Sequence, residues 1–173
     1  MKDQTAFHAA LDDHTRAIET FLSAARRVPE ADWPRPVAPN KWSPGQIAEH
    51  LALSLEAVAR ELSGGRGMRY RMPWWKRFVA KRRYLPGILR SKRFPSGARA
   101  PRETRPSAAA APQTEALARL RAANAAIERI AAADPRTAGR RLRHPYFGRL
   151  SAADLFAVIA LHADHHRGQL PVS

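Results

Sequence analysis

The stretch Ser151-Ala-Ala-Asp-Leu-Phe-Ala-Val-Ile-Ala-Leu-His-Ala-Asp-His-His-Arg-Gly-Gln169 decides how this chain of 173 residues folds. Its apolar side chains recur at the spacing of one helix face, at Leu155, Phe156 and Ile159. The same face continues through His162 and His166, where a buried helix would ordinarily carry Leu or Ile. Two imidazoles four residues apart lie one above the other on a helix, and this spacing can hold one metal ion.

The composition favours an all-helical fold. Hydrophobic residues make up 45% of the chain, Ala and Leu are abundant, and β-branched residues are sparse. No apolar run reaches the length of about 18 residues that a membrane-spanning helix needs, and the first residues lack the apolar region of a signal peptide. We therefore expect a soluble, cytoplasmic protein. The chain has no cysteine, so a transition-metal site would use histidine and carboxylate ligands, which suit Zn, Ni or Fe(II).

Three further segments carry the apolar periodicity of long helices. They cover residues from about 3 to 27, from 44 to the glycines after 63, and from about 112 to 133. The second has a strong start signal, because Ser43 can cap it, Pro44 fits its first position and Gln46 completes a capping box. Ser151 is the expected cap of the last helix. The four helices predict one all-α domain over residues 1–173, a four-helix bundle.

Residues 66–111 form an insertion between the second and third helices. The part from 66 to 105 has fourteen Lys and Arg residues and a single acid, so it carries +13 of the net charge of +15. We expect a short amphipathic helix with a basic face over residues 73–85, interrupted at Pro86, and an extended crossover from Phe94 to Pro112. A connection of this length allows the flanking helices to run in a non-trivial order.

The insertion supports more than one functional interpretation. Its aromatic residues alternate with Lys and Arg, which is typical of segments that bind nucleic acid or lie on an anionic membrane surface. A non-catalytic protein that binds either partner through residues 66–105 is therefore an alternative hypothesis. Its cations would otherwise be solvated charges on a crossover that covers the bundle, or would attract an anionic small-molecule substrate or an acidic thiol such as glutathione.

Three histidines fall on faces that the pattern turns toward the core: His50 on the second helix, and His162 and His166 on the last. A buried imidazole costs a few kcal/mol unless its nitrogens are paired, and one metal ion would engage all three rings. Three protein ligands leave open positions for water or substrate, as catalytic sites do. The alternative is a set of core histidines bonded to backbone carbonyls.

Other polar residues are secondary candidates. His14 lies on the inner face of the first helix, as a core residue or as an acid, base or substrate contact in the cavity. Gln169 shares the face of His166 and would orient that ring or bond the backbone at the helix end. His165 is about 100° away from His166 and is expected to face away or to contact a neighbouring loop. His144 precedes the last helix in a turn, with a capping role or a role in the site.

Three blocks together resemble a known family. They are Trp42-Ser-Pro-Gly-Gln-Ile-Ala-Glu-His-Leu51, His144-Pro-Tyr-Phe-Gly148 and His162-Ala-Asp-His-His-Arg-Gly-Gln169, and they look like the signature stretches of the DinB/YfiT-like superfamily. The resemblance covers roughly residues 1–63 and 112–170 but not the insertion. It implies a four-helix bundle of the DinB type, with His50, His162 and His166 at the positions of the family's three metal ligands.

The family resemblance narrows the function without fixing the reaction. Its members include transferases that join low-molecular-weight thiols to electrophiles, a thiol-dependent isomerase and proteins described only as metal-dependent hydrolases. We therefore expect an enzyme that uses a divalent ion, with zinc ahead of nickel or iron, to activate a thiol for S-transfer or water for hydrolysis. We further expect a homodimer.

Overall fold

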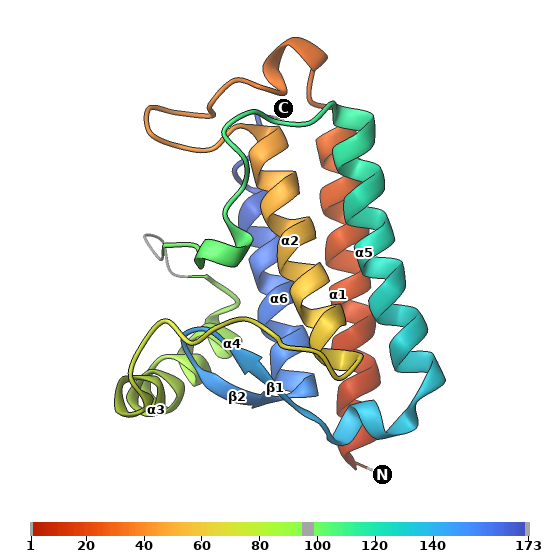
Figure 1. Ribbon diagram of the computed structural model, residues 1–173, viewed down its shortest axis with the longest axis vertical. Helices are drawn as coiled ribbons and strands as arrows, with labels where there is room; N and C mark the ends of the chain where they lie inside the picture. Colours follow the sequence, from red (N-terminus) through yellow and green to blue (C-terminus); the bar gives the residue numbers. More distant parts are fainter. Residues whose placement is uncertain (1, 95–98, 172–173) are drawn as a thin grey trace.

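Four long helices form the body of the protein in a computed structural model that describes residues 2–94 and 99–171. They are α1 (Lys2–Arg26), α2 (Pro44–Leu62), α5 (Gln113–Ala133) and α6 (Ala152–Arg167). In Figure 1 they stand side by side along the long axis of the molecule. The all-α four-helix bundle expected from the sequence is confirmed.

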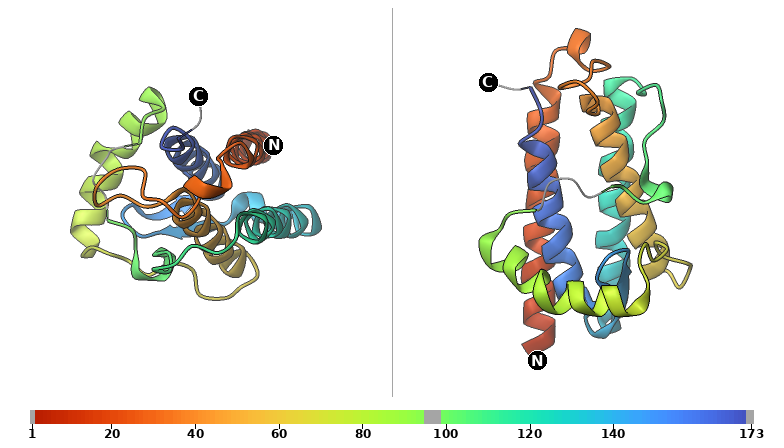
Figure 2. Two further views of the ribbon diagram at one scale, coloured as in Figure 1. Left: turned by 90° about the horizontal axis from the view of Figure 1, so that it is seen from above. Right: turned by 90° about the vertical axis from the view of Figure 1, so that its left-hand side faces the viewer.

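The helices do not simply alternate in direction. In Figure 1, α1 and α6 run upward, whereas α2 and α5 both run downward. The chain must therefore return from the lower end of α2 to the upper end of α5, and the insertion makes this return along one side of the bundle (Figures 1 and 2). Helix α1 packs mainly against α6, and α2 packs mainly against α5. The antiparallel neighbours α2 and α6 bring the histidine faces together at the upper end.

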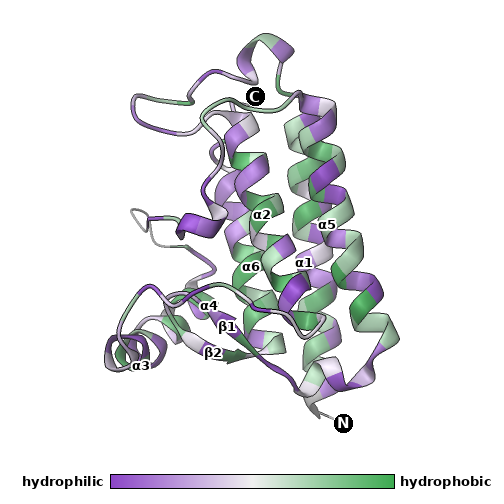
Figure 3. Cartoon of the chain, in the orientation of Figure 1, coloured by the Kyte–Doolittle hydropathy of each residue, from purple (hydrophilic) through white to green (hydrophobic). Residues whose placement is uncertain are grey.

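The expected apolar stripes form the core of the bundle. Leu155 and Phe156 of α6 are completely buried, and so are Ile18 and Phe21 of α1. Figure 3 shows apolar residues along the helices of the bundle and a mixture of polar and apolar residues along the crossover. Burying one such side chain contributes about 1.5–3 kcal/mol. The core therefore fixes the register of the helices, and with it the positions of the histidines.

Local hydrogen bonds begin the two helices that carry the histidines. The Ser43 hydroxyl accepts from the Gln46 amide at 3.2 Å, and the Gln46 side chain accepts from the Ser43 amide at 3.0 Å. This is the capping box that the sequence predicts. At α6, the Ser151 hydroxyl accepts from the Asp154 amide at 3.1 Å. Both caps set the helix start, and hence which residues face inward.

Two local expectations need correction. Pro86 does not merely interrupt the first short helix of the insertion. It lies in the first turn of a second one, because proline fits a position that needs no N–H donor. The two helices are α3 (Trp74–Arg83) and α4 (Leu85–Ser91). The turn at His144 to Gly148 joins two short antiparallel strands, β1 (Arg141–His144) and β2 (Gly148–Ser151), which were not expected.

The remainder of the insertion crosses the upper half of the bundle. The predicted extended crossover from Phe94 to Pro112 includes residues 95–98, which lie outside the described residues. The described part has no helix or strand except for one 3-10 turn, η2 (Arg102–Thr104), and it bends at residues 108–109. Two similar turns, η1 (Glu30–Asp32) and η3 (Pro135–Gly139), follow α1 and α5. Glu49 of α2 accepts from the amide and the hydroxyl of Ser107, both at 2.9 Å, and so fastens the crossover to α2.

Across the described ranges, we find no helix with both the length and the apolar character needed to cross a membrane.

Candidate metal centre

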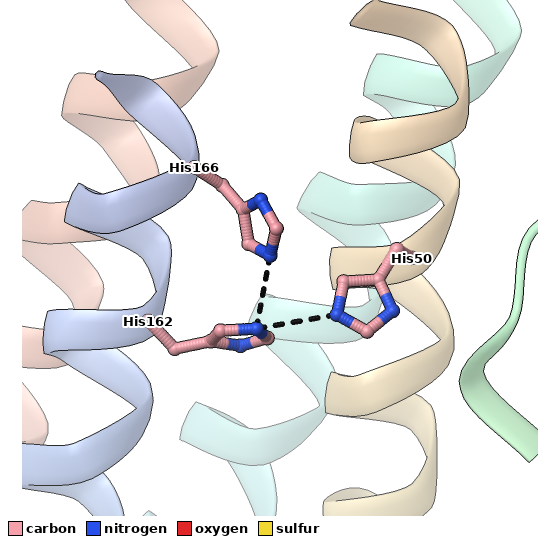
Figure 4. Close-up of side chains that lie close together, drawn as sticks. All are labelled: His50, His162 and His166. Carbon is pink, nitrogen blue, oxygen red and sulfur yellow. Dashed lines mark hydrogen bonds between the residues drawn. The ribbon is translucent and has the colours of Figure 1, made fainter. Parts of the chain in front are cut away.

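The three predicted histidines meet at the upper end of the bundle. His50 lies two turns into α2 and is 4% exposed, and His166 lies in the last turn of α6 and is 7% exposed. His162 is one turn earlier on α6, surrounded by protein but open to a cavity. Figure 4 shows the three rings pointing toward one another from the two facing helices. No other group of three His, Cys, Asp or Glu residues among the described ones has this potential to hold a metal ion.

The Nε2 atoms of the three rings share one small space. The Nε2 atom of His162 is 3.2 Å from that of His50 and 3.0 Å from that of His166. One ligand atom from each residue lies within 4.8 Å of the other two. Nitrogen ligands at about 2.0–2.1 Å from a tetrahedral Zn²⁺ are about 3.3 Å apart, so these separations fit a shared ion.

Partners on the other ring nitrogens fix two of the tautomers. The Nδ1–H group of His50 donates to the carbonyl oxygen of Thr104 at 2.6 Å. The Nδ1 atom of His166 is 2.8 Å from Oε1 of Gln169, whose Nε2 amide group lies 3.0 Å from Nε2 of His165. The amide oxygen accepts, so the Nδ1 atom of His166 carries the proton. In both rings the Nε2 atom is left with a free lone pair.

With these tautomers, hydrogen bonds alone cannot satisfy all three Nε2 atoms of the cluster. The Nε2 atom of His162 has two neighbours, and both are acceptors. A neutral imidazole nitrogen carries at most one hydrogen, so it can donate to only one of them. At least one close nitrogen pair therefore has no hydrogen between its two atoms, and the partial negative charges of the two nitrogens repel each other. A cation between the three atoms removes this repulsion, and the donor set fits a divalent ion that prefers imidazole ligands.

The electrostatics of the site favour neutral rings. Burial lowers the pKa of His166 to about 3, with a further contribution from His50. Burial also lowers the pKa of His50, and it lowers that of His162 well below 6.5, where the neighbouring histidines add to the effect. Metal ligands must be deprotonated. At neutral pH these rings present lone pairs without first releasing a proton.

The secondary candidates separate into two groups. Gln169 lies at the site, where its side-chain oxygen is 2.8 Å from Nδ1 of His166. His14 is not among the residues that line the cavity. It is completely buried in the core and packs against the Phe156 ring at a centroid distance of 5.5 Å. His165 lines the cavity and contacts the Phe94 ring in the neighbouring loop, but it is outside the group of three.

Two contributors to the site were missed from the sequence. The Thr104 carbonyl is a backbone group of the crossover, and no side-chain pattern announces it. Trp42 packs against His50 at a centroid distance of 4.8 Å and stacks on His166 at 6.3 Å. The position of Trp42 directly before the capping box could have indicated this contact, because a residue there lies beside the first turns of α2, which carry His50.

His144, the last residue of β1, lines the cavity as well. Its Nδ1 atom accepts from the backbone amides of Tyr146 and Phe147 at 3.3 and 3.2 Å. An accepting Nδ1 places the ring proton on Nε2. Burial lowers the pKa of His144 to about 3, so the ring stays neutral. Its ring stacks on Phe147 at 4.6 Å, which holds the orientation.

The cavity beside the centre has a volume of about 770 Å³. Large apolar side chains make up much of its wall, among them Trp42, Phe94 and Ile159. No Asp or Glu lines it in the described parts of the chain, whereas Lys41 and Arg99 do. The cavity therefore suits a small molecule with an apolar body and a neutral or anionic polar group.

The family model described as the DinB superfamily matches residues 13–170. The chain belongs to the DinB superfamily. The match includes the insertion, which extends the resemblance seen in the three sequence blocks. Comparison with curated proteins and with solved structures gives no match. The DinB-like fold and the group of three histidines together support a possible metal site in this member.

Proposed function

We propose that this DinB-superfamily protein is a metal-dependent enzyme that activates a low-molecular-weight thiol, by removal of its proton, and joins the thiol through its sulfur atom to an electrophilic small molecule. One observation carries the proposal. The Nε2 atom of His162 lies 3.2 Å from that of His50 and 3.0 Å from that of His166, and hydrogen bonds on the opposite side of His50 and His166 turn the lone pairs of these two rings inward.

Some residues of the site would hold the metal ion, and others would orient the residues that hold it. His50, His162 and His166 would hold the ion, which supplies a positive charge that lowers the pKa of a thiol or water at an open position. The Thr104 carbonyl and Gln169 keep two of the rings in the binding orientation. Such partners of metal ligands typically change metal affinity by about 10–100-fold. Zinc is the best candidate, and nickel or iron would also suit three imidazoles.

The charge of the cavity favours a thiol over water as the nucleophile. Hydrolytic metal sites commonly pair the ion with a carboxylate that takes the proton from water. Here no carboxylate lines the cavity within the described residues. A thiol needs less help, because its pKa of about 8.5 is already close to neutral. Lys41 and Arg99 would attract an anionic thiol or substrate.

His144 would act as a hydrogen-bond donor to the substrate. Its Nδ1 atom is occupied by two backbone amides, so its proton sits on Nε2. The ring lines the cavity and is close enough to His162 to affect its pKa. A neutral imidazole can stabilise negative charge that develops on a substrate oxygen. His144→Ala should therefore reduce turnover by about 10²-fold or more while the metal content stays unchanged.

Metal analysis of purified protein tests the centre. Wild-type protein should contain close to one divalent ion per chain, and His162→Ala should lose it. His8→Ala is the matched control, because His8 is an exposed histidine on α1. Circular dichroism checks that each variant is folded. Full metal retention in His50→Ala, His162→Ala and His166→Ala would contradict the assignment.

Turnover measurements test the reaction. Purified metal-loaded protein is mixed with glutathione, cysteine or coenzyme A and a panel of alkyl halides, epoxides and activated alkenes, and the loss of free thiol is followed. Thiol consumption should depend on the metal and disappear in His162→Ala. Hydrolysis of esters or amides without any thiol, abolished by the same substitution, would replace S-transfer by hydrolysis.

A further inference from the structure

Exposed hydrophobic side chains are concentrated on one segment of this protein. Among the described residues, every exposed large hydrophobic side chain lies between positions 70 and 84: Tyr70, Trp74, Trp75, Phe78, Val79 and Tyr84. Trp74 is 73% exposed and Phe78 is 57% exposed. A set of this kind on one short segment marks an interaction surface, because scattered single residues are the ordinary case.

Helix α3 turns its apolar side away from the protein. At about 100° per residue, Trp74, Trp75, Phe78 and Val79 fall on one side of the helix. The opposite side attaches the helix to the body. Ala80 there is buried. Lys81, which follows it in the sequence, donates to the Arg149 carbonyl at 2.7 Å. In Figure 1 and Figure 2, α3 lies at the edge of the molecule, beside the bundle.

Positive charge surrounds this apolar side. Residues 66–94 contain eleven Lys and Arg residues and no Asp or Glu. Three of these cations lie over exposed aromatic rings: Lys76 at 5.2 Å from the Trp75 centroid, Arg77 at 3.8 Å from that of Tyr70, and Arg82 at 5.6 Å from that of Phe78. The surface thus combines side chains that leave water readily with charges that attract an anionic partner.

We propose that α3 docks on the surface of an anionic lipid bilayer. Trp74, Trp75, Phe78 and Val79 enter the boundary between headgroups and acyl chains, and the neighbouring cations contact the lipid phosphates. Helices that lie in a membrane interface combine an aromatic and aliphatic face with flanking Lys and Arg residues. The enzyme would then work at a membrane surface, a property separate from the chemistry of its metal centre.

The shape of the surface favours lipid over nucleic acid. Proteins that stack bases on aromatic rings do so along a positively charged groove. The aromatic residues of α3 stand on the outer side of a peripheral helix, with the aliphatic Val79 among them. Val79 has no ring that could stack on a base, whereas it can be buried among the acyl chains of a lipid.

Vesicle flotation with the full chain tests the proposal. The protein should float with phosphatidylcholine vesicles that contain phosphatidylserine, and at least ten-fold less with phosphatidylcholine alone. Trp74→Ser/Trp75→Ser should lower the affinity at least ten-fold, because it removes two of the inserting side chains. Lipids with brominated acyl chains should quench the tryptophan emission of the wild type, which simple electrostatic adsorption would not produce.

A pair of charge reversals provides the matched control. Arg82→Glu/Arg83→Glu should weaken vesicle binding at least ten-fold. Arg26→Glu/Arg27→Glu changes the net charge equally, but at exposed positions near the C-terminal end of α1, far from α3 (Figure 1), and should have little effect. Equal losses from both pairs would overturn the proposal. So would tight binding to a DNA or RNA oligonucleotide without binding to the vesicles, or unchanged vesicle binding in Trp74→Ser/Trp75→Ser.

Discussion

Mild acid should destabilise this protein through His14. The side chain is completely buried in α1, and within the described residues neither ring nitrogen meets the geometry of a hydrogen bond. Burial lowers the pKa of His14 from 6.5 to about 4, an effect that the Asn124 side chain only partly offsets. The ring therefore stays neutral in the folded state at a pH where it is protonated in the unfolded chain.

The size and sign of the effect follow from this difference. The folded pKa is the lower one, so the unfolded state binds the proton first and unfolding becomes easier as the pH falls. The contribution is fully present above pH 6.5 and is lost as the pH falls toward about 4. The whole shift corresponds to about 3 kcal/mol, of which about 2 kcal/mol should be lost between pH ~8 and pH ~5.

Urea unfolding in the presence of a chelator measures the pH-dependent contribution of His14 to stability without interference from bound metal. The free energy of unfolding is compared between wild type and His14→Leu at several pH values. The variant should gain about 2 kcal/mol relative to wild type between pH ~8 and pH ~5, because leucine cannot be protonated. Ile18→Val, a buried non-titrating change on the same helix, should cost about 1 kcal/mol at every pH. Parallel curves for wild type and His14→Leu would refute the reasoning.

Three further perturbations have defined outcomes. Gln169→Ala should weaken zinc binding about 10–100-fold in a competition titration without unfolding the protein, and Gln169→Glu should preserve affinity because a carboxylate still accepts from Nδ1 of His166. Gly45→Ala should destabilise the fold by about 1–3 kcal/mol in chemical unfolding, because its new methyl group would lie 2.5 Å from the Cβ atom of Ala110. Ser43→Ala should cost about 1 kcal/mol in the same assay through loss of the helix cap.

The bundle and the histidine group were accessible from the sequence because both depend on helical periodicity. Leu155, Phe156 and Ile159 are buried at the expected spacing, and this register places His162 and His166 on the same face. The start of α2 was equally predictable, since its capping box uses side chains only three residues apart. Patterns of this kind involve only residues that are close together in the sequence, so they can be recognised without knowledge of distant contacts.

Features that depend on distant partners were not accessible. The strand β1, Arg-Leu-Arg-His, has one clear apolar residue, and its pairing with β2 becomes visible only when both strands lie against the bundle. The hydrogen bond from His50 to the Thr104 carbonyl joins residues 54 positions apart through a backbone atom. Periodicity describes one element at a time, so it cannot supply contacts of this kind.

The insertion links the metal centre to the proposed membrane surface, and this determines which experiments can separate the two. Residues 66–111 supply α3 on the outside, and also the Thr104 carbonyl that orients His50 and the Phe94 ring that packs against His162 at 5.2 Å. Deleting the segment would disturb the centre together with the surface, and the loss of activity would say nothing about the membrane.

Substitutions on the outer side of α3 avoid this problem. If both proposals hold, Trp74→Ser/Trp75→Ser should bind metal and turn over a water-soluble substrate as the wild type does, and should fail only where the substrate is presented in a bilayer.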